Sequence, residues 1–152
     1  MAETASAVLE RFRDTSDRIV SELRRLGSDR WPRQIVLRDL RADDVFFDHG
    51  AFAGFVDLTA LGYDAPVADV VRLAGTVSWP GLRWSAVIAS YETLRPFGDI
   101  EPSDLCLLDE ATQLCAMMNW LQWSLLERRS FAPLDVAFGR LRDLATRPPI
   151  AA

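Results

Sequence analysis

Residues 45–56 impose the strongest constraint on how this sequence folds, because two short apolar runs flank a turn. The runs are Val45-Phe46-Phe47 and Phe52 to Val56, and the segment between them is Asp48-His49-Gly50-Ala51. Glycine adopts positive φ values without steric cost, and such a loop between two apolar runs is typical of a β-hairpin. We therefore predict a hairpin here, with His49 exposed in its turn.

Helical spacing of apolar residues dominates the rest of the sequence. A short strand-like run lies at Gln34 to Leu37, and the predicted helices cover residues 5–26, 66–77, 84–91, 102–128 and 136–144. This plan of one helix, a strand and hairpin, then four helices is a mainly α (α+β) domain with a small central β-hairpin. We expect residues 1–152 to form a single domain. Its expected parts are a leading helix (1–30), a loop-and-hairpin segment (34–57) and a helical subdomain (65–147).

Three aspartates flank the predicted hairpin: Asp39 and Asp44 precede it, and Asp57 ends it. A hairpin sends the chain out and back, so we expect these residues to meet at its open end. Converging carboxylates repel one another unless one is protonated or a divalent cation lies between them, and hard oxygen ligands suit Mg²⁺. The alternative is a loop whose aspartates cap turns and bind nothing.

The segment around these aspartates carries a family resemblance. It reads VLRDLRADDVFFDHGAFAGFVDLTALGYDAPVADVVRL over residues 36–73. This is similar to the aminoglycoside phosphotransferase and choline-kinase-like family, which has a protein-kinase-like fold. That family shows H-G-D-L-x-x-x-N, a hairpin, I-D-W/F and then G-D-P-x-x-D-L-A, the counterpart of the kinase catalytic loop and metal-binding aspartate.

The resemblance implies a role for four aspartates. Asp39 resembles the catalytic aspartate that orients a substrate hydroxyl and accepts its proton. Asp57 resembles the aspartate that binds Mg²⁺ bridging the ATP phosphates, and Asp44 takes the asparagine's place as the second metal contact. Asp69 matches a helix aspartate that holds the catalytic loop through its backbone amides. The implied activity is ATP- and Mg²⁺-dependent phosphoryl transfer to a small-molecule hydroxyl.

Several positions depart from the family pattern. Leu37 stands where the family has histidine, Arg38 where it has glycine, and Asp44 where it has asparagine. All 17 basic residues are arginine, so the phosphate-pairing lysine is not in this sequence. The 34 residues before the motif leave no room for a β-rich nucleotide lobe, so the resemblance is to the C-terminal lobe only.

These departures leave three hypotheses. The chain is the catalytic lobe of a phosphotransferase, or it is a degenerate remnant that acts as a binding or oligomerising module. In the second case we expect a second copy or a partner chain to cover the exposed lobe interface. The third hypothesis is an unrelated helical domain whose loop mimics the motif.

Charge and composition restrict the partners and the compartment. The net charge is −5, which disfavours a nucleic-acid partner because binding phosphates requires clustered positive charge. The N-terminus lacks the apolar stretch of a signal peptide, and the most apolar segment, residues 114–126, is too short to span a bilayer. We therefore expect a cytoplasmic protein that binds neither membranes nor nucleic acid.

The two cysteines agree with that compartment. Cys106 and Cys115 lie nine residues apart on one predicted helix, which separates them by about 13 Å, too far for a disulfide. We expect two free cysteines packed in the core, as in a reducing cytosol.

Overall fold

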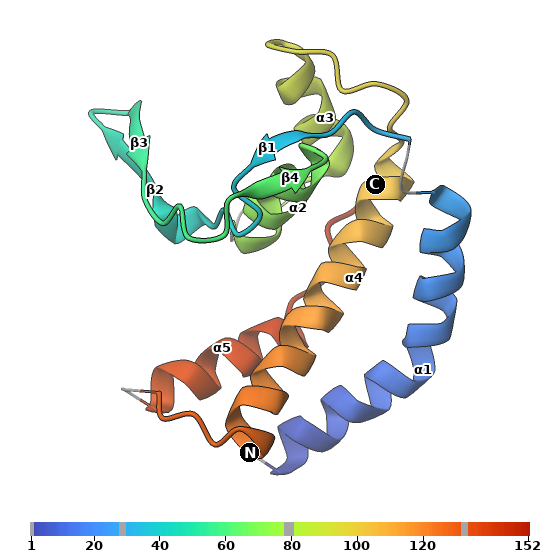
Figure 1. Ribbon diagram of the computed structural model, residues 1–152, viewed down its shortest axis with the longest axis vertical. Helices are drawn as coiled ribbons and strands as arrows, with labels where there is room; N and C mark the ends of the chain where they lie inside the picture. Colours follow the sequence, from blue (N-terminus) through green and yellow to red (C-terminus); the bar gives the residue numbers. More distant parts are fainter. Residues whose placement is uncertain (1, 28–29, 78–80, 132–133) are drawn as a thin grey trace. The chain divides into compact units, whose positions relative to one another are not determined.

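The computed structural model describes residues 2–27, 30–77, 81–131 and 134–152. The helices and strands are drawn in Figure 1. The α-helices are α1 (Ala2–Leu26), α2 (Val67–Thr76), α3 (Trp84–Glu92), α4 (Pro102–Leu121) and α5 (Leu134–Thr146), with a 3₁₀ turn η1 (Ala42–Asp44) and a π-helical turn η2 (Gln122–Leu126). The strands are β1 (Gln34–Val36), β2 (Val45–Asp48), β3 (Ala51–Phe55) and β4 (Gly62–Asp64).

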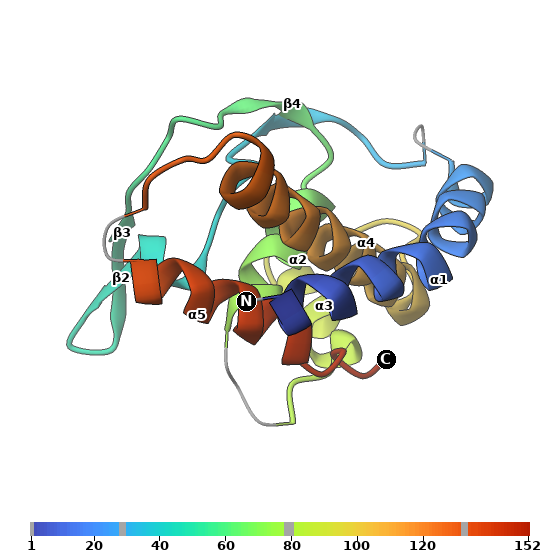
Figure 2. The same ribbon diagram turned by 90° about the horizontal axis from the view of Figure 1, so that it is seen from below.

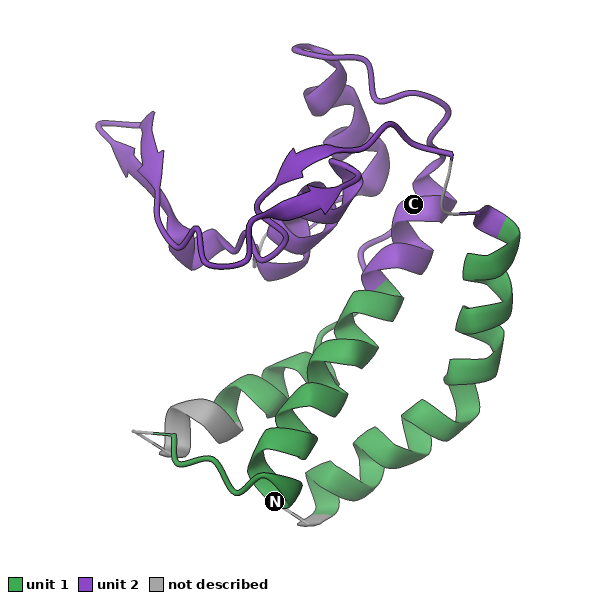
Figure 3. Cartoon of the chain, in the orientation of Figure 1, with its two compact units in different colours: residues 1–25, 110–149 green, residues 26–109, 150–152 purple. Residues whose placement is uncertain are grey.

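The chain divides into two compact units, coloured separately in Figure 3. Unit 1 comprises residues 1–25 and 110–149, and unit 2 comprises residues 26–109 and 150–152. Helix α4 contributes to both units. The expectation of a single domain stays a prediction.

Unit 1 is helical, and its apolar side chains are buried at helical intervals. On α4, Leu114, Met117 and Leu121 are spaced three and four residues apart, and all three are buried. Val8 and Ile19 of α1 and Leu141 of α5 are buried as well. The apolar stripe of each helix therefore supplies the core of this unit.

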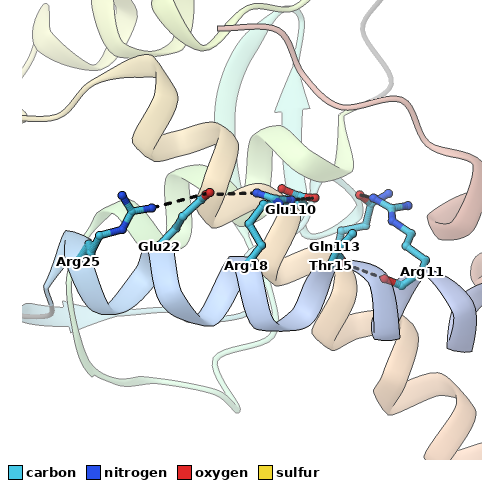
Figure 4. A network of polar contacts seen from close by, with 7 residues as sticks. All are labelled: Arg11, Thr15, Arg18, Glu22, Arg25, Glu110 and Gln113. Carbon is cyan, nitrogen blue, oxygen red and sulfur yellow. Dashed lines mark hydrogen bonds and ion pairs between the residues drawn. The ribbon is translucent and has the colours of Figure 1, made fainter.

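Polar side chains connect the helices of unit 1, as Figure 4 shows for α1 and α4. Arg18 donates to Glu110 at 2.6 Å and to Glu22 at 3.2 Å. Arg11 donates to Oε1 of Gln113 at 3.0 Å, and Nε2 of Gln113 donates to the carbonyl of Leu144 at 2.6 Å. Gln113 is buried, so its bonds to α1 and α5 compensate for the loss of hydration.

Unit 2 has the larger apolar core. Helix α2 contributes Val67, Val71 and Ala74, which share one face of the helix. The other buried members are Trp31, Ala65, Trp84, Phe97, Ile100 and Leu105, of which Trp84 is completely buried. The face of α2 that points away from this core is available to hold the loop that precedes the hairpin.

Two separate two-stranded sheets belong to unit 2. Strands β1 and β4 pair antiparallel with Gln34 opposite Asp64, and β2 and β3 pair antiparallel with Val45 opposite Phe55. In the β2–β3 hairpin, Phe46 lies opposite Gly54 and Phe47 opposite Phe52, so β3 contains one extra residue, a β-bulge at Ala53.

The mainly α fold with a small β element is confirmed, and so are the predicted hairpin and helix order. The structure adds β4, which the sequence did not predict, and it ends α4 at Leu121, where the predicted helix continued to residue 128 as an α-helix. Both cysteines are free, as expected, but the expectation that both lie in the core was wrong, because Cys115 is exposed. His49 is exposed, as predicted. No helix in the described part of the chain is long and apolar enough to cross a bilayer.

Candidate active site

One face of α2 holds the loop that contains Asp39. The carboxylate of Asp69 accepts the backbone N–H of Leu37 at 2.8 Å and that of Arg38 at 2.7 Å. One helical turn later, Arg72 contacts Asp39, and a further turn on, Oγ1 of Thr76 accepts the N–H of Ala42 at 2.9 Å. Positions 69, 72 and 76 share a helix face, so α2 fixes the loop at three successive points.

Arg72 binds the carboxylate of Asp39 and so fixes the orientation of that side chain. Its Nε donates to Oδ1 of Asp39 at 2.8 Å, and its Nη2 lies 2.6 Å from the same oxygen. The Asp39 side chain is still 50% exposed. Both contacts use Oδ1 of the carboxylate.

Arg38 has a backbone conformation that glycine adopts most readily. Its φ is 66°, in the left-handed region, which costs about 1 kcal/mol for a residue with a Cβ. Its side chain crosses Gly62 of β4, where an added Cβ would lie 2.6 Å from Cδ of Arg38, and ends 3.8 Å from the carboxylate of Asp64. The bond from its N–H to Asp69 offsets part of the backbone strain.

The base of the hairpin brings Asp44 and Asp57 into neighbouring positions. The N–H of Val56 donates to the carbonyl of Asp44 at 2.9 Å, next to the paired residues Val45 and Phe55. The carboxylate of Asp44 also accepts the N–H of Arg41 at 3.1 Å and so closes the 3₁₀ turn η1. The backbone of Asp44 is therefore joined across the hairpin to Val56, the residue directly before Asp57.

Asp57 carries a carboxylate that is ionised at neutral pH. Its Oδ1 accepts the hydroxyl of Thr59 at 2.5 Å and the N–H of Thr59 at 3.1 Å. The side-chain hydrogen bond, followed by the backbone one, lowers the pKa of Asp57 below its ordinary value. Its φ is 63°, a second left-handed position in this region. Both hydrogen bonds go to Oδ1, so an exposed, charged Oδ2 suits a divalent cation.

The carboxylate of Asp39 has a basic partner, Arg72. Among the described residues, no group of three or more His, Cys, Asp or Glu side chains is arranged to hold a metal ion. The expectation that Asp39, Asp44 and Asp57 converge on one cation stays a prediction, and in the structure the carboxylate of Asp39 pairs with Arg72. The metal roles of Asp44 and Asp57 and the catalytic role of Asp39 stay predictions.

Sequence reasoning missed Arg72, Thr76 and Thr59. The first two were detectable, because they follow Asp69 at three and seven residues and so lie on the same face of a predicted helix. Thr59 lies two residues after Asp57, a spacing at which an aspartate side chain commonly binds the backbone of its own turn.

The Asp57–Thr59 contact predicts a measurable titration effect. Thr59→Val removes the side-chain hydrogen bond, so we expect the pKa of Asp57 to rise toward the ordinary aspartate value of about 3.9. Because folding lowers this pKa, the contribution of Asp57 to stability is present above the unfolded-state value. It is lost as the pH falls through the folded-state value. Carboxyl ¹³C NMR without divalent cations measures the shift.

A matched control for that titration is Thr93→Val. The Thr93 hydroxyl bonds only the carbonyl of Ser90 among its described partners, so this variant should leave the Asp57 titration unchanged. An unaltered titration in Thr59→Val would show that Thr59 does not set the pKa of Asp57.

Comparisons with known proteins identify the family and the fold of this chain. A family model described as a phosphotransferase enzyme family matches residues 1–100 of the chain. The fold is also similar to a solved structure of an amicoumacin kinase, hAmiN, in complex with AMP-PNP, Ca²⁺ and Ami, with a TM-score of 0.52 and 13% sequence identity. At this identity the likeness shows the fold alone. No curated protein matches the sequence.

The structural match covers 97% of this chain but only 46% of the kinase, so the chain spans about half the length of that relative. The family resemblance seen in residues 36–73 and the fold class are both confirmed. Because the family model matches residues 1–100, about two thirds of the sequence, we conclude that this chain belongs to the phosphotransferase enzyme family.

Proposed function

We propose that this chain supplies the catalytic-loop lobe of an ATP- and Mg²⁺-dependent phosphotransferase that acts on a small-molecule hydroxyl. The observation that carries the proposal is the three-point attachment of residues 37–42 to α2 through Asp69, Arg72 and Thr76. Phosphoryl transfer depends mainly on positioning and charge stabilisation, so a rigidly held aspartate on an exposed loop is the feature that this chemistry requires.

Asp39 is the proposed general base and orienting group. Arg72 holds Oδ1 of Asp39, and the other oxygen accepts a hydrogen bond from the substrate hydroxyl and then its proton. Asp69 keeps the peptide before Asp39 in place, so that the carboxylate does not move when the substrate binds. These are positioning and proton-accepting roles of the chain's own residues.

Asp44 and Asp57 are the proposed ligands of Mg²⁺. Their oxygen donors and the ionised state of Asp57 fit a hard divalent cation, and two carboxylates with phosphate and water oxygens complete the usual shell. A cation held by these two carboxylates would supply positive charge that offsets the negative charge developing during phosphoryl transfer. The free cysteines support a cytoplasmic location for this reaction.

The lysine that contacts nucleotide phosphates in kinases must come from elsewhere. All 17 basic residues here are arginine, and the chain covers 46% of the kinase it resembles. We propose that a further polypeptide segment supplies the nucleotide-covering part of the site.

A second candidate function is a non-catalytic binding module. Two guanidinium nitrogens of Arg72, Nε and Nη2, contact the same carboxylate oxygen of Asp39. In addition, Leu37 occupies the position where the family has histidine. An aspartate that stays in this ion pair does not accept a substrate proton. The fold would then persist without turnover.

Titration calorimetry with Mg-ATP distinguishes the two candidates. We expect the 152-residue chain to bind ATP measurably in the presence of Mg²⁺. Chelation of the metal or the variant Asp57→Asn should weaken that binding by at least about tenfold.

The matched control for this experiment is Asp99→Asn, which removes an exposed aspartate outside the site and should leave the affinity unchanged. If the wild type gives no heat of binding, the phosphotransferase proposal fails for this chain and the binding-module reading is favoured.

A further inference from the structure

Arg38 directly precedes the proposed general base, and the proposed function gives it no role. Its backbone has a φ of 66°, a conformation that suits glycine and is strained for arginine. Strained backbone positions cluster at functional sites, where the surrounding structure holds them in place. The bond from the N–H of Arg38 to Asp69 is such a restraint. The side chain at this position is therefore a candidate for a further role in the site.

The ion pair with Asp64 is too weak to explain the arginine. Nε of Arg38 lies 3.8 Å from Oδ2 of Asp64, beyond hydrogen-bonding distance, and the two side chains are 55% and 43% exposed. Exposed pairs of this kind contribute little to stability. A guanidinium carries five N–H donors, and that of Arg38 donates no hydrogen bond to any residue that the structure describes.

Strand β4 provides the space in which the guanidinium lies. The Arg38 side chain passes over Gly62, where a Cβ would lie 2.6 Å from Cδ and 2.9 Å from Nη1. Two residues later on the same strand, the carboxylate of Asp64 attracts Nε. The absence of a side chain at position 62 and the charge at position 64 together hold an exposed guanidinium in a defined place.

Most of the acids close to Arg38 in the sequence have other partners. The carboxylate of Asp39 pairs with Arg72, and that of Asp44 accepts the N–H of Arg41. Asp64 is the acid that contacts Arg38, at 3.8 Å. The second arginine of this loop, Arg41, has a side chain that is only 27% exposed. Arg38 is therefore the more accessible of the two positive charges that the loop places beside the general base.

We propose that Arg38 binds an anionic group of the phosphate acceptor, a phosphate monoester or a carboxylate, while Asp39 binds the acceptor's hydroxyl. This inference rests on the proposed function, because it assigns the anion to the molecule that receives the phosphoryl group. The planar fork of a guanidinium matches the paired oxygens of either anion. Consecutive Cα atoms are about 3.8 Å apart, so one small molecule is able to contact both side chains.

The nucleotide is the other anion of the proposed reaction, but its metal ligands belong to a different part of unit 2. Asp44 and Asp57 lie at the base of the β2–β3 hairpin, whereas the Arg38 side chain lies over β4, which pairs with β1. Figures 1 and 2 show these two sheets as separate parts of the same unit. This separation favours the acceptor as the ligand of Arg38.

NMR of the arginine Nε–Hε groups, recorded on the full chain without nucleotide, tests the proposal. The probes are glycerol 3-phosphate and glycerate, with glycerol as the uncharged reference. We expect at least one of the two anions to shift the Arg38 signal with a dissociation constant on the order of 1 mM. Glycerol should leave the signal unchanged. The anion that binds more tightly distinguishes a phosphorylated acceptor from a carboxylate acceptor.

Arg38→Gly should weaken binding of the preferred anion by at least about tenfold, measured from the backbone amide shift of Asp39. This variant should fold, because glycine suits the backbone conformation and the N–H that bonds Asp69 remains. Gly62→Ala keeps the arginine but displaces its guanidinium, so it should weaken binding in the same direction. Arg38→Lys keeps the charge without the fork and should recover part of the affinity.

The matched control is Arg33→Gly, which removes an exposed arginine of the same unit outside the loop and should bind the anion like the wild type. An Arg38 signal that neither anion shifts, or that Mg-ATP alone shifts, would overturn the proposal. Unchanged affinity in Arg38→Gly would overturn it as well.

The NMR titration contains no nucleotide, so the two proposals fail separately. If Mg-ATP does not bind while an anion shifts the Arg38 signal, the phosphotransferase proposal fails. The anion site then stands, but its assignment to an acceptor does not. If Mg-ATP binds and neither anion does, the phosphotransferase proposal stands and the role of Arg38 is refuted.

Discussion

Asp39→Asn is expected to lower the rate of phosphoryl transfer from Mg-ATP by at least about a hundredfold, because a positioned general base contributes about 10²- to 10⁴-fold. Asparagine retains an oxygen that accepts from Arg72, so the loop keeps its contact with α2. What it loses is the negative charge and the ability to take the hydroxyl proton. The measurement is transfer of the γ-phosphoryl group to hydroxyl acceptors, with water as the reference acceptor.

The fold of Asp39→Asn should be unchanged, and its unfolding midpoint in urea should match the wild type. Asp99→Asn serves as the matched control, since Asp99 is an exposed aspartate outside the loop. Equal rates for Asp39→Asn and wild type would remove Asp39 from the mechanism and leave the chain a binding module.

Asp69→Ala is expected to lower the free energy of unfolding by about 3 kcal/mol. The carboxylate accepts two backbone N–H groups, from Leu37 and Arg38, and each hydrogen bond to a charged group contributes about 1.5–3 kcal/mol. We use the lower value because the bond to Arg38 is exposed. For a chain of this size the expected fall in melting temperature is about 6–12 °C.

Comparing the stability of Asp69→Asn with that of Asp69→Ala separates the loss of the two hydrogen bonds from other effects of changing residue 69. Asp69→Asn keeps one acceptor oxygen and should lose about half as much stability as Asp69→Ala. Asp99→Ala should have little effect. A loss below about 1 kcal/mol in urea unfolding of Asp69→Ala would mean that other contacts hold the loop.

The helices and the hairpin were predictable because their signals are local. Apolar spacing identifies α1, α2, α3 and α5, and the Gly50 turn identifies β2 and β3. Strand β4 was not predictable, because Gly62-Tyr63-Asp64 has neither length nor alternation, and its partner β1 lies about 30 residues earlier. Helix α4 carries apolar residues around its whole circumference rather than on one face, so its sequence did not show that Cys115 faces solvent.

The site was predictable where backbone pairing fixes it and not elsewhere. Asp44 directly precedes β2 and Asp57 follows the end of β3 by two residues, so the pairing brings the backbone of Asp44 next to Val56, the neighbour of Asp57. Asp39 lies five residues before Asp44 and beyond the η1 turn, so pairing does not constrain it, and the charge on Arg72 decides where its side chain goes. The register of the hairpin depends on a bulge at Ala53, which the sequence does not mark.

Arg38 and Gly62 have become mutually dependent. The arginine occupies a backbone conformation that suits glycine, and its side chain needs the space that Gly62 leaves empty in the neighbouring strand. Enlarging position 62 while Arg38 is present forces the guanidinium away from Asp64, whereas the same change after Arg38→Gly meets no obstacle. The effects of substitutions at these two positions are therefore not expected to be additive, because each changes the space available to the other.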